Sequence, residues 1–460
     1  MKPSSFDKSI TEGPILRAVW KLAWPTMLQN MIAGLQGVID HTMVGHYVGY
    51  QGNAAIGVSW QIFLVVVVFI SSLYSGTAVL VARFAGAQNS ERVNNTVYQS
   101  FLISVLIAMG IMAPAGYMLT PKLLELVKAA PNVRAEALPY LRIMFLFSLG
   151  QLLFFLFGGA LRAAGDAKTP LRLGFALTVM NLIFNVILIP GLGPIPRFGT
   201  TGAAIGTVTA SMLVAFTAVY LMFSGRLVVK FSRGMRWSPN FAIISQLFRF
   251  GLPTGFQGVI VNIGGVLMLR FIGSLEQGAE AQAAFTVCYT QLFALITWTS
   301  VGLMGATAAV AGQNLGANKP DRTREAVRKA GFIGLMLAGT VGSAFLFIPE
   351  VLLSVFGMED AVVLDLGRQL LHYLAISGLF ISIALAYTGG LQGTGDTRSP
   401  LFISILSQAA VPIGYCLIRQ QMGILQPADI WLAIVMGHFT RCTLSFLRFK
   451  QGHWESIKVH

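Results

Sequence analysis

Long apolar segments, separated by short polar connections, recur along the whole chain. Runs such as IFLVVVVFI (62–70) and FLFSLGQLLFFLFGGAL (145–161) contain no charged residue. Segments of about 20 apolar residues cross a bilayer as helices, because a helix satisfies its own backbone hydrogen bonds in lipid. The pattern therefore predicts an all-α integral membrane protein. Its twelve transmembrane segments are expected at roughly 15–40, 53–82, 93–119, 138–162, 169–190, 200–224, 243–272, 281–311, 327–348, 369–393, 399–418 and 428–448.

The composition agrees with a membrane protein and weakens one alternative. Of the 460 residues, 55% are hydrophobic and 11% are charged, against about 25% charged residues in soluble domains. The net charge of +14 would suit a nucleic-acid-binding protein, but most lysines and arginines lie at the termini and in the even-numbered connections. The odd-numbered connections hold only Lys122, Lys128, Arg134, Arg197, Arg270 and Arg419. This asymmetry predicts that both termini are cytoplasmic, and no nucleic-acid partner is expected.

Two motifs recur at an offset of half the chain. GALRAAGDAKTP and GGLQGTGDTRSP place Asp166 and Asp396 at an offset of 396 − 166 = 230 residues. GAQNSER and GANKPDR begin at Gly86 and Gly316, again 316 − 86 = 230 residues apart. Such a parallel repeat predicts two six-helix bundles related by an axis along the membrane normal, with the substrate path between them. The N-terminal lobe is expected at 1–225, a basic cytoplasmic linker at 226–240 and the C-terminal lobe at 241–460.

A third repeat places a proline inside the first and seventh predicted helices. Pro25 and Pro253 each begin a P-T-x-x-Q motif, which ends at Gln29 and Gln257. With these prolines and the G-D-x-x-x-P turns after helices four and ten, the chain resembles the multidrug and toxic compound extrusion (MATE) family over essentially its whole length. The resemblance implies two bundles around a V-shaped central cavity. It also implies a secondary antiporter that exports organic, often cationic, drugs or toxic compounds in exchange for H+ or Na+ by alternating access.

The motifs of other energy sources and of metalloenzymes are absent from the sequence. No Gly-Lys dipeptide occurs, so the phosphate-binding G-x-x-x-x-G-K-[ST] loop of ATP-driven pumps is missing. No H-E-x-x-H motif or other metal-ligand spacing occurs among the six histidines. An ion gradient remains the expected driver. We expect neither enzymatic activity nor a cofactor.

Asp40 is the acidic residue that lies farthest inside a predicted helix. A helix rises 1.5 Å per residue, so Asp40 is expected in the outer half of the membrane rather than at its centre. It is either an interfacial residue that caps the helix or, if His41–Tyr47 extend the helix, a carboxylate inside the lobe. In the MATE family an aspartate at this motif position couples transport to the cation, as H+ or as a possible Na+ site. Desolvation favours its protonated form, whereas bound Na+ favours the carboxylate.

Helix five carries two polar residues that the family resemblance assigns to the same cation-coupling site as Asp40. In MNLIFN, Asn181 and Asn185 are four residues apart and share a helical face. They are either interhelical contacts of a common kind or, as the family implies, cation-coupling residues together with Thr207 of helix six. Some archaeal relatives carry aspartate where this chain has Asn185, which leaves the choice between H+ and Na+ open.

The second half lacks the equivalent residues. By the repeat offsets, Asp40 corresponds to Met268, and Asn181 and Asn185 correspond to Val411 and Tyr415. Other branches of the family use carboxylates in helices seven and ten, and residues 251–272 and 369–393 contain none. The pattern resembles the DinF-like branch, with coupling confined to the N-terminal half and no carboxylate expected beside Tyr415.

The prolines and glutamines have two interpretations each. Pro25 and Pro253 remove backbone hydrogen bonds and kink a helix; these kinks are either static or hinges that move during transport. Gln29 and Gln257 are expected to face the central interface and line the substrate cavity.

The main alternative is a lipid-linked oligosaccharide flippase of the same superfamily, which should carry more cations inside its helices than Arg142, Arg368 and Arg441. A membrane scaffold without transport would leave Asp40 and the repeated prolines unexplained. We expect a monomer in the prokaryotic cytoplasmic (inner) membrane, with lipid and small organic substrates as its partners.

Overall fold

All regular structure in the described part of the chain is helical. The computed structural model describes residues 6–127, 129–232, 238–358 and 360–459, and the side chains of 64–71 lie outside this description. Residues 233–237 of the predicted linker are therefore not covered. Each of the twelve predicted segments coincides with one helix or with a run of consecutive helices. The predicted all-α membrane fold is confirmed.

The chain divides into two compact units, and two long helices belong partly to each. Unit 1 is built mainly from Leu28–Gly255, whereas unit 2 contains Asp7–Met27 and Phe256–His460. The first half of helix α2 therefore belongs to unit 2, and the first half of helix α10 belongs to unit 1. Both helices change unit two residues after their internal proline, Pro25 or Pro253. The lobes expected at 1–225 and 241–460 remain a prediction.

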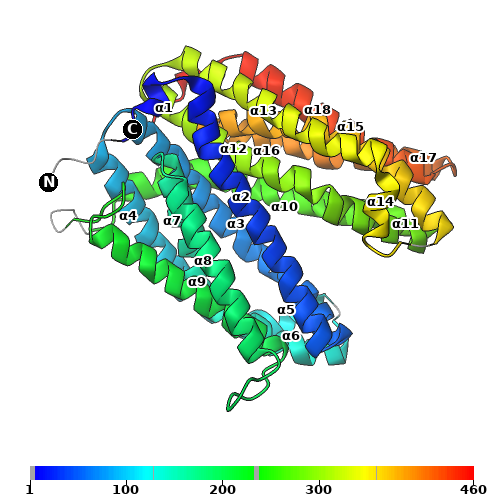
Figure 1. The fold of residues 1–460 in the computed structure, drawn as a ribbon. Coiled ribbons are helices and arrows are strands. Elements are labelled where there is room, and N and C mark those ends of the chain that lie inside the picture. The colour runs from blue at the N-terminus through cyan, green and yellow to red at the C-terminus, as the bar shows by residue number, and fades with distance from the viewer. Residues whose placement is uncertain (1–5, 128, 233–237, 359, 460) are drawn as a thin grey trace. The chain divides into compact units, whose positions relative to one another are not determined.

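Unit 1 is a bundle in which α9 packs against α6, α7 and α8, and α3 packs against α4, α6 and α7. Helices α8 and α9 lie side by side in Figure 1. The helices that contribute to this unit are α2 (Ile15–Tyr47), α3 (Tyr50–Gly86), α4 (Ser90–Ile107), the π-helical η1 (Ala108–Met112), α5 (Ala113–Leu126), α6 (Pro131–Leu146), α7 (Ser148–Ala163), α8 (Lys168–Leu188), α9 (Thr200–Phe223) and α10 (Phe241–Gly273).

Unit 2 is organised around α15, which packs against α12, α13 and α18. Two of its helical runs contain π-helical turns. Besides the shared α2 and α10, its helices are α1 (Ser9–Glu12), α11 (Gly278–Phe285), η2 (Thr286–Leu292), α12 (Ala294–Gly316), α13 (Pro320–Phe347), α14 (Pro349–Ser354), α15 (Ala361–Thr394), α16 (Arg398–Ser404), η3 (Ile405–Ala410), α17 (Val411–Gln421), α18 (Pro427–Lys450) and η4 (His453–Ser456).

Length and apolarity support most of the predicted crossings. Among the described residues, nine helical spans are long and apolar enough to cross a membrane, and the pair α6 and α7, bent by 52°, adds a tenth. The other two predicted segments are α2 and α3, which are 33 and 37 residues long. Neither of these two helices is among the spans found in the described residues, and the side chains of residues 64–71 in α3 are not described. Twelve crossings therefore remain a prediction.

The two copies of the G-D-x-x-x-P motif have the same backbone conformation. Gly165 and Gly395 end α7 and α15 with φ of 101° and 98°, a conformation that is costly for residues with a Cβ. Each glycine is followed by an aspartate that accepts a hydrogen bond from the backbone N–H three residues later, over 3.0 Å for Asp166 and 3.2 Å for Asp396. Each bond satisfies a backbone N–H group in the first turn of the next helix. The G-D-x-x-x-P motif thus encodes the same tight turn twice.

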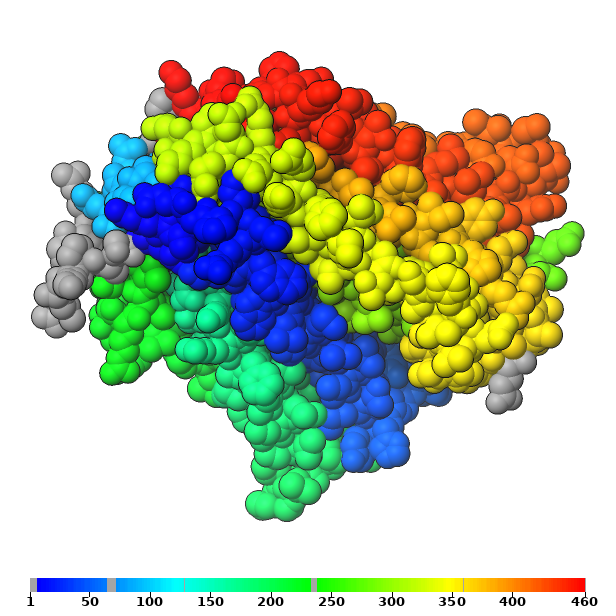
Figure 2. Space-filling model, turned by 45° about the horizontal axis from the view of Figure 1, so that its top comes forward, coloured from blue at the N-terminus to red at the C-terminus, as the bar shows by residue number. Residues whose placement is uncertain are grey.

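A short helix near the N-terminus, α1, is held inside unit 2 by Asn314 on α12 and by Lys319 and Arg322 of the repeated GANKPDR motif. Arg322 Nη2 donates to the Gly13 carbonyl over 2.7 Å, Lys319 Nζ donates to the Thr11 carbonyl over 3.0 Å, and Asn314 Nδ2 donates to the Ile10 carbonyl over 3.3 Å. Figure 2 shows this N-terminal segment (dark blue) against the yellow-green start of α13. Donors from α12 and α13 therefore satisfy the free carbonyls at the end of α1.

Candidate functional site

Asp40 lies inside helix α2 of unit 1, seven residues before the helix ends at Tyr47. The alternative that Asp40 only caps the helix end is therefore wrong. The carboxylate is half-buried, and its Oδ1 accepts a hydrogen bond of 2.6 Å from Asn185 Nδ2 on α8. This short contact to a charged group links α2 to α8.

The two helix-five asparagines and Thr207 extend this contact into a chain of side chains. Asn185 Nδ2 also donates to Asn181 Oδ1 over 3.2 Å, and Asn181 Nδ2 donates to Thr207 Oγ1 on α9 over 3.1 Å. Asn181 and Asn185 are 1% and 0% exposed. The structure thus brings together all four residues predicted for cation coupling. The same bonds also join three helices, as the interhelical-contact interpretation expects.

One acceptor in this cluster has no donor. Asn185 Oδ1 is buried and forms no hydrogen bond with the described residues. Gly206 on α9 leaves space beside it, because a Cβ at Gly206 would lie 2.7 Å from that oxygen. Buried polar atoms are normally satisfied, so an unpaired acceptor next to a carboxylate is a candidate ligand for a cation.

The oxygen atoms of the cluster are suited to bind a hard monovalent cation. It offers the Asp40 carboxylate, the Asn181 and Asn185 amide oxygens and the Thr207 hydroxyl, and oxygen is the ligand type that such ions prefer. No group of three or more His, Cys, Asp or Glu residues arranged to hold a metal occurs in the described part of the chain. A Na+ ion here would meet one negative charge and neutral oxygens.

Further polar contacts along α2 were not predicted. Gln29 Oε1 accepts a hydrogen bond from Arg162 Nη2 over 3.1 Å, and Gln36 Oε1 accepts one from Thr178 Oγ1 over 2.9 Å. Together with Asp40, these side chains form a polar ladder, Gln29–Gln36–Asp40, that attaches α2 to α7 and α8. The spacing of seven and four residues puts them on one helical face, which is the signal that the sequence carried.

The two glutamines predicted for the substrate cavity form contacts within their own units. Gln257 is 6% exposed, its Nε2 donates to Ser404 Oγ over 2.9 Å, and its Oε1 accepts from Gln392 Nε2 over 3.0 Å. Gln29 is bound by Arg162 in unit 1. Their role in a substrate cavity and the hinge role of Pro25 and Pro253 stay predictions.

The repeat-related position in unit 2 differs from the expectation in one respect. Met268 is buried, and no carboxylate lies on α10 beside it, as the sequence predicted. However, Tyr415 Oη donates to Asp429 Oδ1 over 3.1 Å, so the expectation of no carboxylate beside Tyr415 is wrong. Asp429 belongs to the capping box of α18 and also accepts from Arg419 Nη2 over 3.2 Å, so its charge is compensated.

Comparisons with known proteins agree with this architecture. The family model described as MatE matches residues 25–187 and 253–418, and both matched segments begin at the repeated prolines. The chain is 26% identical over 455 residues to the "Probable multidrug resistance protein NorM" of Thermotoga maritima, covering 97% of this chain and 94% of that protein. It is 23% identical over 415 residues to the "Multidrug export protein MepA" of Staphylococcus aureus, covering 88% and 87%.

Solved structures show the same fold. An outward-facing conformation of a multidrug resistance MATE family transporter of the MOP superfamily superimposes with a TM-score of 0.89 at 21% identity, over 99% of both chains. A MATE structure in the bent conformation gives a TM-score of 0.87 at 21% identity, over 98% of this chain and 97% of that one.

Proposed function

Because this chain belongs to the MATE family, we propose that it is a secondary active antiporter that exports organic, often cationic, drugs or toxic compounds in exchange for H+ or Na+. The coupling cluster is formed by Asp40, Asn181, Asn185 and Thr207 in unit 1. Alternating access between two states supplies the transport step. Multidrug export by the named relatives supports the substrate class.

The observation that carries the proposal is the contact between Asp40 and Asn185. A half-buried carboxylate accepts from a fully buried amide over 2.6 Å, and the oxygen of the same amide has no donor. Asp40 can therefore exchange this amide partner for a bound proton or sodium ion. An ion site of this kind can alternate between occupied and empty states, which is what antiport requires.

The polar ladder offers a route from ion binding to helix movement. When a cation occupies Asp40, the hydrogen bond from Asn185 weakens, and α2 loses one of its three polar attachments to α7 and α8. Pro25 lies N-terminal to all three attachments, where the helix already lacks a backbone bond. A change of ion occupancy would then change the path of α2 at the proline, with Pro253 in the corresponding position of α10.

Several finer features follow from the same reading. We propose the DinF-like branch, because the coupling cluster lies in the first half and residues 251–272 and 369–393 contain no carboxylate. We also propose a monomer in the prokaryotic inner membrane with both termini cytoplasmic. Of the three arginines named for the flippase alternative, Arg368 is paired with Glu350 over 2.7 Å and Arg142 stacks on Tyr117 with its guanidinium 4.5 Å from the ring centroid, which leaves that alternative with Arg441 alone.

Dye efflux tests the function directly. Inverted vesicles are loaded through the transporter while a proton gradient or a sodium gradient is imposed separately. We expect transport with at least one gradient in the wild type and loss of gradient-driven transport in Asp40→Asn, which keeps the shape and removes the titratable charge. The variant should still insert and bind some substrate. Transport at wild-type rates in Asp40→Asn would show that Asp40 is not the coupling group.

A further inference from the structure

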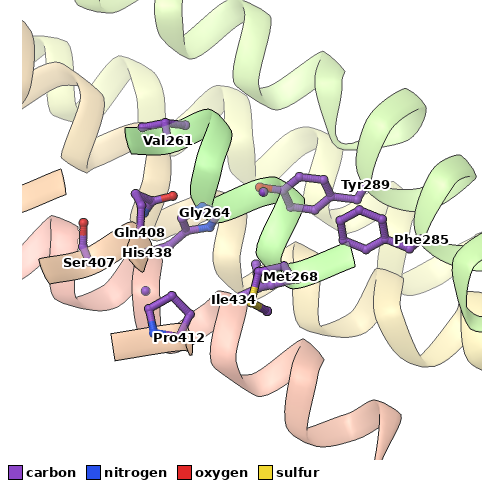
Figure 3. A pocket seen from close by; sticks show the side chains of 12 residues that line it. Val261, Gly264, Met268, Phe285, Tyr289, Ser407, Gln408, Pro412, Ile434 and His438 are labelled. Atoms are coloured by element: carbon purple, nitrogen blue, oxygen red, sulfur yellow. The ribbon is translucent and has the colours of Figure 1, made fainter. Parts of the chain in front are cut away.

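Two pockets of unit 2 differ in size and in lining. The smaller has a volume of about 70 Å³ and lies between the second half of α10, η2, η3 and α18, where Figure 3 shows Tyr289, Gln408 and His438 around it. No lysine, arginine, aspartate or glutamate is among the described residues that line it. The larger is a groove of about 570 Å³ between the first half of α2 and α13. Its volume lies within the roughly 300–1,000 Å³ of small-molecule sites.

Both walls of the groove are apolar, and both belong to unit 2. Leu16 and Trp20 form the wall on α2, and Phe332 and Met336 form the wall on α13. All four side chains are exposed. Each pair is spaced by four residues, so its two members lie on one face of their helix. The groove therefore offers a continuous apolar surface along two neighbouring helices, which is suited to a hydrocarbon chain.

Two cations lie at one end of the groove. Arg17 is exposed and belongs to the lining itself. Lys329 is half-buried and precedes Phe332 and Met336 by three and seven residues, which puts it on the same face of α13. Neither cation takes part in the ion pairs found among the described residues. The nearest carboxylate along α13, Glu325, lies one turn closer to the start of the helix. Both positive charges are therefore available to an anion.

The cations lie near the starts of their helices, at one membrane surface. Arg322 on α13 donates to the carbonyl of Gly13, two residues before α2 begins, so the two helices start side by side. Arg17 lies in the first turn of α2, and Lys329 lies in the third turn of α13. Lysine, arginine and tryptophan are typical of the membrane interface. The charges are therefore at the level of lipid phosphates, and the apolar walls continue from there toward the lipid chains.

We propose that this groove binds an anionic phospholipid from the leaflet at which α2 begins, which is the cytoplasmic leaflet in the proposed orientation. Arg17 and Lys329 take the phosphate, and one acyl chain lies between α2 and α13. Charge selects this occupant, because each lysine or arginine near a membrane surface raises the affinity for anionic lipid about fivefold. The site goes beyond the proposed export function. A lipid held there contacts α2 before Pro25, so it strengthens the attachment of the first half of α2 to unit 2.

The test measures lipid binding to the purified full-length protein by native mass spectrometry. Phosphatidylglycerol and phosphatidylcholine with the same two oleoyl chains are titrated separately into the protein in detergent. We expect phosphatidylglycerol to bind more tightly at the first site. Arg17→Gln and Lys329→Gln should each weaken phosphatidylglycerol about fivefold, with little change for phosphatidylcholine, whereas Arg17→Lys keeps the charge and should keep the affinity. Phe332→Ala removes part of the apolar wall and should weaken both lipids.

Arg172→Gln is the matched control, because Arg172 is also an exposed arginine near the start of a long apolar helix, α8, and does not line the groove. Its affinity for phosphatidylglycerol should match the wild type. Equal affinity in wild type, Arg17→Gln and Lys329→Gln, or an equal loss in Arg172→Gln, would overturn the site. Inorganic phosphate that binds as tightly as the lipid would overturn the role of the apolar walls.

The same spectra report the oligomeric state. A dimer that Phe332→Ala dissociates would assign the groove to a second copy of the chain and overturn the lipid site. Phosphatidylglycerol binding that depends on Arg17, in a protein that no gradient can drive, would refute the proposed antiport and leave this site intact.

Discussion

Replacing Asn185 with leucine removes the amide from the coupling cluster and keeps a side chain of similar size. That amide is fully buried and donates to Asp40 over 2.6 Å and to Asn181 over 3.2 Å. Leucine donates to neither. The ionised Asp40 then loses its hydrogen bond from Asn185. We expect the dye-binding residues to be unaffected, because the substitution lies in the ion-coupling cluster.

The size of the effect follows from the kind of bond that is lost. A hydrogen bond to a charged group contributes about 1.5–3 kcal/mol, and each 1.4 kcal/mol is a factor of about ten. If every transport cycle passes through the ionised form of Asp40, we expect turnover in Asn185→Leu to fall by about 10- to 100-fold. The apparent affinity for the dye should change much less.

The assay is dye uptake into inverted vesicles, which is the export direction, at matched expression and measured as a function of pH and of sodium concentration. Asn314→Leu is the control, since Asn314 is also 0% exposed and hydrogen-bonded but belongs to unit 2, whereas Asp40 belongs to unit 1. We expect the ion dependence to change in Asn185→Leu and to match the wild type in Asn314→Leu. Equal changes in both variants, or a loss of dye affinity with normal turnover, would refute the reasoning.

Three further predictions concern the space beside Asn185, the ion pair of Asp7 with Lys21, and the turn at Gly395. Gly206→Ala places a Cβ 2.7 Å from Asn185 Oδ1, so efflux should fall while folding is retained; Gly37→Ala, where a Cβ meets nothing within 4 Å, should leave efflux unchanged. Burial opposes the ionised form of Asp7, but hydrogen bonds from Lys21 and Ser9 outweigh it and lower the pKa of Asp7. The Asp7–Lys21 pair therefore stabilises the fold above about pH 4, and the melting-temperature difference between wild type and Asp7→Asn should shrink as the pH falls below that value. Gly395→Ala forces alanine to φ of 98° and should destabilise by about 1–2 kcal/mol in thermal melts; an unchanged melting temperature would contradict the turn assignment.

The fold was largely predictable from the apolar pattern and the repeat. The G-D-x-x-x-P turns, predicted from two matching strings, have the same backbone conformation at Gly165 and Gly395. The end of α2 was harder, because His41–Tyr47 are polar enough to be read as a connection, and only the packed helix shows Asp40 to be internal. The π-helical turns and the 52° bend between α6 and α7 carry no period that a sequence pattern reveals.

Helical periodicity and the family resemblance predicted the main residues of the candidate site. A spacing of four residues put Asn181 and Asn185 on one face, and the family resemblance supplied Asp40 and Thr207. Arg162 and Thr178, the partners of Gln29 and Gln36, were missed because their proximity to α2 depends on the packing of other helices. Asp429 was missed for a different reason: it is a capping residue at the start of α18, and its contact with Tyr415 lies outside the repeat.

The anchoring of α1 has a consequence for biosynthesis. The carbonyl of Gly13 is bound by Arg322, which lies 309 residues later in the chain. At a synthesis rate of about 5–20 residues per second, the N-terminal segment leaves the ribosome about 15–60 s before its partner exists. During this interval the first residues of unit 2 have no unit to join. Insertion of the later helices therefore sets the earliest time at which unit 2 can fold, and a ribosome stalled before Arg322 should leave the N-terminal segment open to protease.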